Sequence, residues 1–302
     1  MHEVTSAVAM IRGQRAPKRD LISVGVSLAA PFSPTRSRAP ERTMGACGSS
    51  PGSKWEAATG DGVFRLASAS SPGFAEAVEV ATRSFSGTAS TDPERCIDWC
   101  VGERYAGKWD DPTRLEYFRW IARLVLAMTI RAGKSQTILC ARAPGTDDAT
   151  GAICAVHLYA SKPSGAGTLM RFVYFMTCVV GEPPWQRSDA RIAARMSAND
   201  EAMFRSHRKH APGRHVYVQM MAVDPKAQGL KLCSKLMRAV NRLADAWGVP
   251  CYLETSGERN VEVYRRFGYE VVEKLKVPDP EDPDDAFDEF FCMVRPATRE
   301  YR

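Results

Sequence analysis

The sequence has no apolar run long enough to cross a membrane and no composition typical of a fibrous or wholly disordered chain. Its most hydrophobic stretch, residues 121–130, contains Arg123, whereas a spanning helix needs roughly 20 predominantly apolar residues. The 22 glycines and 19 prolines among 302 residues are close to average usage, which excludes a collagen-like chain. The net charge of +6 is too small by itself to indicate a nucleic-acid-binding protein. We therefore expect a globular protein that binds no nucleic acid.

The cysteines and histidines show no pattern of a disulfide framework or a metal site. The nine cysteines are odd in number and have no repeated spacing, which favours reduced, buried thiols in a cytoplasmic protein. His207, His210 and His215 lie close in sequence, but no cysteine lies nearby, and Glu201 is the carboxylate considered to complete a metal site. We predict a basic surface segment there and no bound metal.

The first 60 residues differ from the rest of the chain. Residues 1–43 contain seven basic and three acidic side chains among Ser, Ala and Pro, without an apolar period, as in a disordered or transit-like leader. From Met44 the sequence MGACGSS matches an N-myristoylation signal, and Cys47 could carry a second acyl chain. Membrane association then requires that Met44 is the true start; the alternative is a Gly/Ser-rich linker. The predicted division is a leader or linker over 1–60 and one folded domain over 61–302.

Strand and helix patterns are mixed along the folded domain. Runs of β-type residues predict strands at 63–67, 137–141, 151–159, 216–223, 251–255, 269–277 and 290–294. Helical periods and end signals predict helices at 72–85, 112–132, 188–210, 232–247 and 261–267. Without the helix inside the long insertion 161–214, which precedes the fourth strand, the order is β-α-α-β-β-β-α-β-α-β-β. This order predicts an α/β fold with a mixed central sheet flanked by helices.

The most informative segment joins the strand at 216–223 to the helix at 232–247. The N-terminus of a helix leaves unpaired backbone N–H groups, which together with the helix dipole bind phosphate. Lys226, Lys231 and Lys235 add positive charge around the same turn. A strand–helix connection that binds no ligand would show the same order of elements.

Two sequence blocks around this helix resemble the GNAT (GCN5-related N-acetyltransferase) superfamily. The first is AVDPKAQG at 222–229, and the second is YLETS at 252–256 followed by Asn260 and VYRRFGYEVV at 263–272. The resemblance implies the GNAT fold and an N-acetyltransferase that moves the acetyl group of acetyl-CoA to a primary amine by direct attack. The implied partner is a small-molecule amine or a basic peptide, and acetyl-CoA is the implied co-substrate.

The resemblance also implies where the cofactor binds. Met221, Ala222 and Val223 would lie along the pantetheine arm, and a backbone N–H near Val223 would stabilise the oxyanion. The pyrophosphate loop would consist of Gln228, Gly229, Leu230, Lys231, Leu232, Cys233 and Ser234. Lys231 replaces a signature glycine of the family and Cys233 replaces its second small residue. The β-carbon of Lys231 would crowd the phosphate, or its ammonium group would compensate by pairing with it.

The catalytic residues implied by the resemblance lie in the second block. Asn260 and Tyr264 are one helical turn apart; Asn260 would lie beside the cofactor, and the Tyr264 phenol would protonate the leaving thiolate. The attacking amine must lose a proton, and Glu254 and His215 are the candidate bases, with a water chain as the alternative.

Two alternatives to this function and its acceptor stay open. The loss of the loop glycine at Lys231 fits a catalytically weak or inactive GNAT-like module that binds acyl-CoA or acts as a scaffold, lipid-anchored if Met44 is the true start. Residues 279–289 contain seven acidic side chains and no basic ones. We expect a solvated loop there, or, if it borders the acceptor site, one that favours a cationic acceptor.

Overall fold

The computed structural model covers most of the predicted folded domain. It describes residues 55, 59–60, 62–66, 68–131, 135–143, 150–163, 180–185, 189–282 and 284–298. These residues belong to one compact unit, Gly48–Arg302. The predicted leader and the acylation signal at Met44 lie outside the described residues.

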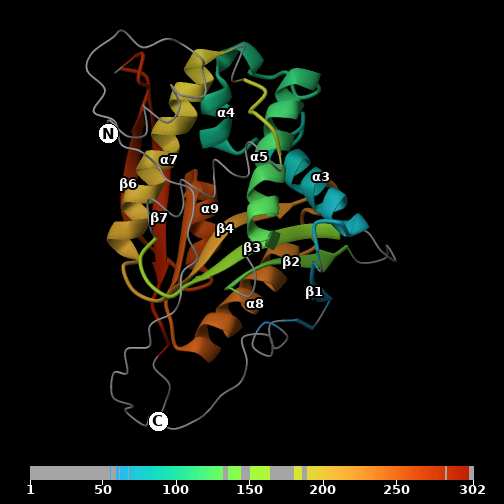
Figure 1. Ribbon diagram of the computed structural model, residues 1–302, viewed down its shortest axis with the longest axis vertical. Coiled ribbons are helices and arrows are strands. Elements are labelled where there is room, and N and C mark those ends of the chain that lie inside the picture. Colours follow the sequence, from blue (N-terminus) through green and yellow to red (C-terminus); the bar gives the residue numbers. More distant parts are fainter. Residues whose placement is uncertain are drawn as a thin grey trace, which may run out of the picture. The chain divides into compact units, whose positions relative to one another are not determined.

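Seven strands form one mixed sheet in the order β1-β2-β3-β4-β5-β7-β6. The strands are β1 Val63–Arg65, β2 Gln136–Arg142, β3 Thr150–Tyr159, β4 His215–Val223, β5 Cys251–Ser256, β6 Glu270–Pro278 and β7 Ala286–Arg295. Neighbouring strands pair antiparallel except β4 and β5, which run parallel. Figure 1 shows β6 and β7 at one end of the sheet and β1 at the other. The predicted fold class, a mixed central sheet flanked by helices, is confirmed.

The helices follow the predicted order, with one addition. They are α3 Pro72–Ser86, α4 Arg95–Val101, α5 Pro112–Arg131, α7 Ala190–His210, α8 Leu232–Trp247 and α9 Glu258–Arg265. The sequence did not predict α4, which is only seven residues long. Glu94 caps it, because its Oε2 accepts a hydrogen bond from the backbone N–H of Ile97 at 2.6 Å. Gly133, predicted to end the second helix, lies outside the described residues.

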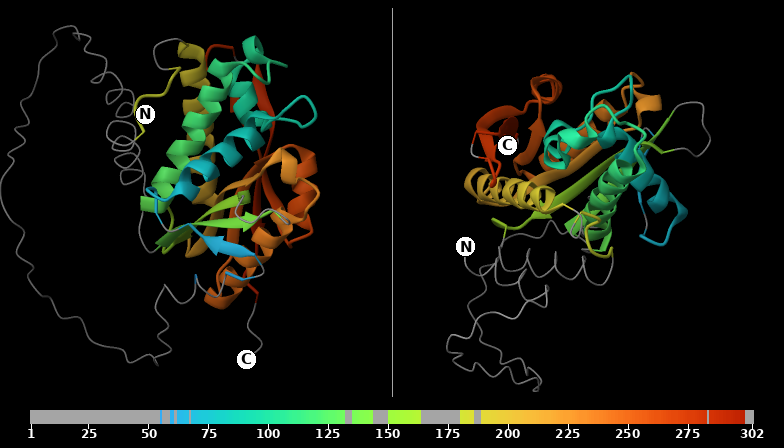
Figure 2. Two further views of the ribbon diagram at one scale, coloured as in Figure 1. Left: turned by 90° about the vertical axis from the view of Figure 1, so that its right-hand side faces the viewer. Right: turned by 90° about the horizontal axis from the view of Figure 1, so that it is seen from above.

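Helices cover both faces of the sheet, as the views in Figure 2 show. Alternate residues of β2 face opposite layers: Leu139 packs in the cluster that contains α8, whereas Ile138 and Cys140 pack in the cluster that contains α3 and α5. Side chains on both faces of β2 and β3 are therefore removed from water. This agrees with the nearly continuous apolar sequences of the two strands. Burying one such large aliphatic side chain stabilises the fold by about 1.5–3 kcal/mol.

The apolar face of α8 forms the main core, as its periodicity predicted. Leu232, Leu236 and Leu243 are all buried in one cluster. Gly248 ends the helix in the left-handed conformation, with φ 60°. Trp247, the last residue of α8, packs edge-to-face on Trp55 with 5.4 Å between ring centroids, so the described unit extends at least to Trp55.

The predicted helix at 188–210 is confirmed as α7, but part of its interpretation was wrong. Asp189 caps it by accepting hydrogen bonds from the backbone N–H groups of Arg191 and Ile192. His207 and His215 are buried at 5% and 1% exposure, so they do not form an exposed basic segment. Within the same turns of α7, Arg205 and Lys209 face solvent, whereas His207 is buried.

The described residues include seven of the nine cysteines. The seven cysteines among them carry free thiols, and all but Cys233 are buried. In the described part of the chain, no group of three or more His, Cys, Asp or Glu side chains is arranged to hold a metal ion. Among those same residues, no helix combines the length and hydropathy needed to span a bilayer.

Candidate functional site

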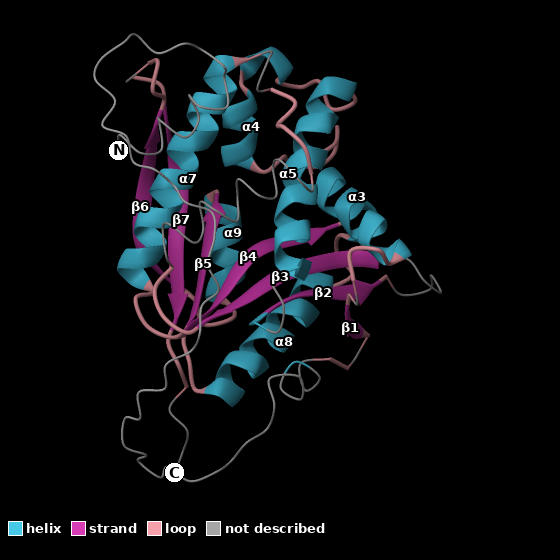
Figure 3. Ribbon diagram, viewed as in Figure 1, coloured by secondary structure: helices cyan, strands magenta, loops and turns pink. Residues whose placement is uncertain are grey.

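The two central parallel strands separate along their length. The ladder joins Val216–Val218 of β4 with Cys251–Leu253 of β5 and does not continue along the rest of these fully described strands. On the other side, Val218 pairs with Val156 and Met220 with Ala155, so Gln219 is an extra residue that bends β4. Figure 3 shows β4 and β5 diverging from this paired base. Backbone groups on the facing edges of the two strands are thus left without a partner strand.

The turn after β4 leads to the open N-terminus of α8. Asp224 accepts a hydrogen bond from the backbone N–H of Lys226 at 3.0 Å and starts a short 3₁₀ turn. The first backbone N–H bonded within α8 is that of Lys235, to the carbonyl of Lys231 at 3.1 Å. The N–H groups of Leu232, Cys233 and Ser234 therefore have no acceptor inside the helix. They can serve as donors to an anion at this terminus.

Lys231 takes the backbone conformation that a glycine would adopt without cost. Its φ of 59° and ψ of 22° are left-handed, and it is the only non-glycine residue with positive φ in the described part of the chain. This conformation costs an L-residue about 1–2 kcal/mol. Gly229, two residues earlier, also has positive φ, 82°. The turn thus holds a left-handed residue other than glycine, and it presents an exposed lysine side chain.

The predicted pantetheine-binding residues lie where β4 has left β5. Ala222 packs towards α3 and α5, and Met221 and Val223 pack towards α8. The N–H of Asp224 bonds to the carbonyl of Gly151 in β3, so by alternation that of Val223 points away from β3. It donates to the Ser84 hydroxyl at 3.3 Å. The predicted oxyanion donor thus has a partner from α3, which an acyl group would have to displace.

Tyr264 and Asn260 lie on α9, on the same side of the sheet as α8. Tyr264 is buried in the core cluster with Val218 and Leu253. Burial raises the pKa of Tyr264 well above its ordinary value, with a smaller contribution from the Cys233 thiol. The phenol therefore stays protonated and lies near the predicted pyrophosphate loop. Asn260 is exposed, and its Nδ2 donates to the carbonyl of Ser256 at 3.0 Å.

Glu254 lies on the opposite face of β5, just beyond the last paired residue. The residue is partly buried, and its Oε1 is closed off from solvent without a hydrogen-bond partner. Burial raises the pKa of Glu254 to about 7, against hydrogen bonds from Tyr217 and Tyr252 that lower it. A carboxyl group with this pKa can take a proton near neutral pH.

A second buried carboxyl group, Glu94, was missed in the sequence. Its Oε1 accepts a hydrogen bond from the Ser256 hydroxyl at 2.5 Å, at the end of β5. Burial raises the pKa of Glu94, while the Ser256 hydroxyl and the backbone N–H groups at the start of α4 lower it. Since the Ser256 carbonyl also accepts from Asn260, Glu94 ties α4 to the turn that starts α9. Glu94 had no sequence signal because its helix is too short to show a period.

Gln219, the bulged residue, was also missed. The Thr129 hydroxyl of α5 lies 3.5 Å from its Oε1 and 3.1 Å from the Nε2 of His157. The bulge depends on the register between β3 and β4, which a single strand pattern does not contain. These polar groups lie beside the point where β4 and β5 separate.

His215, the second candidate base, is engaged elsewhere. Its Nε2 lies 2.7 Å from the Nε2 of His207, and its Nδ1 lies 2.8 Å from the carbonyl of Gly213. A carbonyl only accepts, so Nδ1 carries the proton and Nε2 accepts from His207. Burial lowers the pKa of His215, and of His207 to about 3. Both rings are neutral, and neither nitrogen of His215 is available to an amine.

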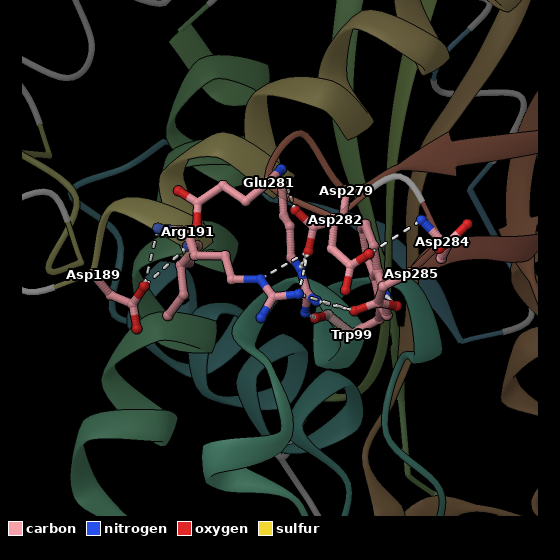
Figure 4. A network of polar contacts seen from close by, with 10 residues as sticks. Trp99, Asp189, Arg191, Asp279, Glu281, Asp282, Asp284 and Asp285 are labelled. Carbon is pink, nitrogen blue, oxygen red and sulfur yellow. Dashed lines mark hydrogen bonds and ion pairs between the residues drawn. The ribbon is translucent and has the colours of Figure 1, made fainter.

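Two of the acidic residues between β6 and β7, Asp279 and Asp285, take part in a network of polar contacts with α7, which Figure 4 shows. Asp279 is buried and accepts hydrogen bonds from Arg191 and Arg195 of α7, each at 2.8 Å. Asp285 pairs with Arg195 and accepts from the Trp99 indole at 3.0 Å. The expectation of a wholly solvated loop is therefore wrong for Asp279, because arginines of the insertion neutralise it. The exposed Glu281, Asp282, Asp284 and Asp288 keep their solvated positions.

Comparison with known proteins connects this geometry to one family. Residues 189–269 match the model of the Acetyltransferase (GNAT) family. A structure titled histone acetyltransferase HPA2 and related acetyltransferase from Corynebacterium glutamicum is 15% identical, with 80% of this chain and 98% of that chain covered and a TM-score of 0.45. Naa20 from Chaetomium thermophilum, solved with a bisubstrate analogue, is 14% identical (78% and 86% covered, TM-score 0.37). The Drosophila melanogaster polyamine N-acetyltransferase is 16% identical (58% and 78% covered, TM-score 0.38).

The matched segment contains the features described above. It extends from the start of α7 through β4, the turn, α8 and β5 to the end of α9. The separating strands, the open helix N-terminus, Glu254 and Tyr264 all lie within it. The resemblance drawn from the sequence is thereby confirmed: residues 189–269, part of a mixed α/β fold, match the model of the GNAT acetyltransferase family.

Proposed function

We propose that the protein is an acetyl-CoA-dependent N-acetyltransferase that acetylates a primary amine. The observation that carries this proposal is the separation of β4 from β5 after three paired residues, directly beside the open N-terminus of α8. The separation exposes a strand edge to which an extended pantetheine arm can pair, as an added strand would. The helix terminus supplies N–H donors for the pyrophosphate. Acetyl-CoA has this combination of an extended amide-containing arm and a diphosphate.

The two predicted catalytic groups approach this position from opposite faces of the sheet. Glu254 lies with Tyr217 and Tyr252 on one face, and Tyr264 lies with Val218 and Leu253 on the other. In the proposed reaction, Glu254 accepts the proton of the ammonium group, and the free amine attacks the thioester carbon. The tetrahedral intermediate collapses and expels the thiolate, which Tyr264 protonates. The nitrogen of the new amide then loses its extra proton to solvent. The acceptor is a small-molecule amine or a basic peptide.

Substituting Glu254 and Tyr264 one at a time tests the role of each. We expect Glu254→Gln and Tyr264→Phe each to lower kcat by about 10²-fold, the lower end for a lost general base or acid. Neither side chain belongs to the turn that holds the diphosphate, so both variants should bind acetyl-CoA with nearly unchanged Kd. Release of CoA thiol from the full chain, followed with a panel of amines and lysine-containing peptides, gives kcat; calorimetry gives Kd.

Matched controls separate chemistry from folding. Glu270→Gln changes an exposed carboxylate at the start of β6, and Tyr105→Phe changes a buried phenol packed on Tyr117; neither should change kcat. An unchanged kcat in Tyr264→Phe removes this phenol from the reaction. Tight binding of acetyl-CoA without turnover of any amine identifies the inactive acyl-CoA-binding module instead, and the absence of binding overturns both functions.

A further inference from the structure

One side chain of α3 occupies the edge of β4 from which β5 has separated. By alternation the backbone N–H of Val223 points to this edge, and it donates to the Ser84 hydroxyl at 3.3 Å. The pairing with β5 ends at Val218, so none of the carbonyls of this fully described strand accepts from Val223. The Ser84 oxygen therefore takes the position that an acceptor group of an added strand would occupy.

The Ser84 hydroxyl carries a proton that the described part of the chain does not use. A serine hydroxyl can donate one hydrogen bond while it accepts another, and within a helix it can donate to the carbonyl four residues earlier. On the same helix, the Thr82 hydroxyl donates in this way to the carbonyl of Val78 at 2.8 Å. Ser84 accepts from Val223, but none of the described residues accepts its proton. This half-buried residue thus presents a donor at the open edge of β4.

Polar contacts at two points hold α3 against the sheet. Next to Ser84, Arg83 donates to Oδ2 of Asp224 from Nε at 3.0 Å and from Nη2 at 2.5 Å. Asp224 directly follows Val223, and its side chain is only 10% exposed. Nearer the start of α3, Glu76 accepts from the backbone N–H of Thr150 at 2.8 Å and from its hydroxyl at 3.0 Å. The Ser84 hydroxyl is therefore held at the edge by a fixed helix.

The length of the pantetheine arm indicates which of its groups Ser84 faces. Val223 is the last residue of β4 before the turn that leads to α8, the proposed diphosphate site. The arm has about twelve bonds between the diphosphate and the sulfur, as many as four residues of backbone, and spans roughly 13 Å when extended. Four residues before Val223 is Gln219, next to the last residue of β4 that pairs with β5. The thioester of a bound acyl-CoA therefore belongs near Gln219, and the amide nearest the diphosphate belongs near Ser84.

We propose that Ser84 is a cofactor-binding residue whose hydroxyl donates to the pantetheine amide carbonyl nearest the diphosphate while it still accepts from Val223. The N–H of Val223 polarises the hydroxyl and so strengthens the hydrogen bond that it donates. This contact breaks no bond of the free protein, whereas a carbonyl bound directly to the Val223 N–H would have to displace Ser84. The inference deepens the proposed function and rests on its placement of acyl-CoA at this edge. Ser84 lies outside the segment 189–269 that matches the family model.

Calorimetry of the full chain with three ligands tests this contact. CoA and acetyl-CoA contain the arm, whereas 3′-phospho-ADP is the nucleotide part of CoA without it. Ser84→Ala should raise the Kd of CoA and of acetyl-CoA by about fivefold, the scale of one neutral hydrogen bond, and leave the Kd of 3′-phospho-ADP unchanged. The matched control is Ser86→Ala, which removes a buried hydroxyl of the same helix that donates to the carbonyl of Gly87 at 3.3 Å. It should leave all three Kd values unchanged.

The pattern across the ligands decides the outcome. Unchanged or tighter binding of CoA by Ser84→Ala overturns the proposal, because a hydroxyl that only fills the edge would compete with the arm. A loss confined to acetyl-CoA also overturns it, since the contact would then be with the thioester, and so does an equal loss for 3′-phospho-ADP, which would indicate a damaged turn. If the unchanged protein binds CoA but turns over no amine, the proposed enzymatic function fails, while the binding series still decides the role of Ser84. If it binds no CoA, both fail.

Discussion

Lys231 holds a left-handed backbone conformation in a turn where a β-carbon is costly. The conformation costs about 1–2 kcal/mol for an L-residue, and the φ of 59° shows that the turn imposes it. A glycine would remove that strain, but it would also increase the entropy of the unfolded chain by a comparable amount. The lysine is exposed, so its ammonium group is available to a bound phosphate. Stability alone therefore does not explain the residue.

Two substitutions separate the charge of Lys231 from its backbone. Lys231→Asn removes the charge while keeping a residue that tolerates the left-handed region, and Lys231→Gly removes charge and β-carbon together. If the ammonium pairs with phosphate, we expect both variants to weaken acetyl-CoA binding by about tenfold at low salt, the scale of one charge-assisted hydrogen bond. Calorimetry measures this. Tighter binding by Lys231→Gly than by the unchanged chain would show instead that the β-carbon crowds the phosphate.

For single residues of the candidate site, the sequence indicated which side chains are of interest but not which side chains surround them. Asn260 and Tyr264 were predicted one helical turn apart, and both lie on α9; their roles at the cofactor stay predictions. The environment of Glu254 depends on Tyr217, which comes from another strand. Such contacts can be predicted only when the neighbouring strands and their register are known, because the alternation of side chains along one strand does not show which strands pair.

The short helix α4 connects elements that are distant in sequence. Trp99 of α4 lies against the Arg195 guanidinium, 4.5 Å from its ring centroid, and donates to Asp285. Arg195 donates to the Trp99 carbonyl at 2.6 Å and to Asp279 at 2.8 Å. The residues between β6 and β7 are thereby fixed to α4 and α7. The sequence could not show this, since α4 is stabilised by its Glu94 cap and by tertiary contacts rather than by its own periodicity.

A buried and an exposed ion pair together test how burial changes the contribution of a charge pair to the free energy of unfolding. The side chains of Arg195 and Asp279 are 5% and 0% exposed, whereas those of Arg119 and Glu79 are 45% and 40% exposed. Removing one partner of a buried pair leaves an uncompensated charge, so Asp279→Asn should lower the free energy of unfolding by about 3 kcal/mol. Glu79→Gln, the matched control, should cost less than about 1 kcal/mol. Urea unfolding of both variants measures the difference, and equal costs would contradict the structural role of Asp279.

At the scale of the whole molecule, buried ionisable groups of opposite type have shifted pKa values, Glu254 on β5 and His207 on α7. Glu254 is held with a pKa of about 7, and His207 with a pKa of about 3. Each shift reflects burial that disfavours the charged form. The apolar layers on both faces could be predicted from the sequence, but the polar groups that they enclose could not, because some of them, such as His207, come from the insertion. These groups make the stability of the fold depend on pH.

The sign of that dependence differs on the two sides of the stability maximum. The pKa of Glu254 is higher in the folded than in the unfolded chain, so its contribution is complete below about pH 4.5 and is lost as the pH rises through about 7. The pKa of His207 is lower in the folded chain, so its contribution is complete above about pH 6.5 and is lost as the pH falls towards about 3. The two slopes oppose each other between about pH 4.5 and pH 6.5, so we expect the highest Tm as a broad maximum in that range. Glu254→Gln should remove the decline above that range and shift the maximum upwards, whereas His207→Gln should flatten the acid side. Scanning calorimetry of the three proteins at low salt measures both effects, and a Tm that rises steadily from pH 5 to pH 8 would show that Glu254 ionises freely in the folded state.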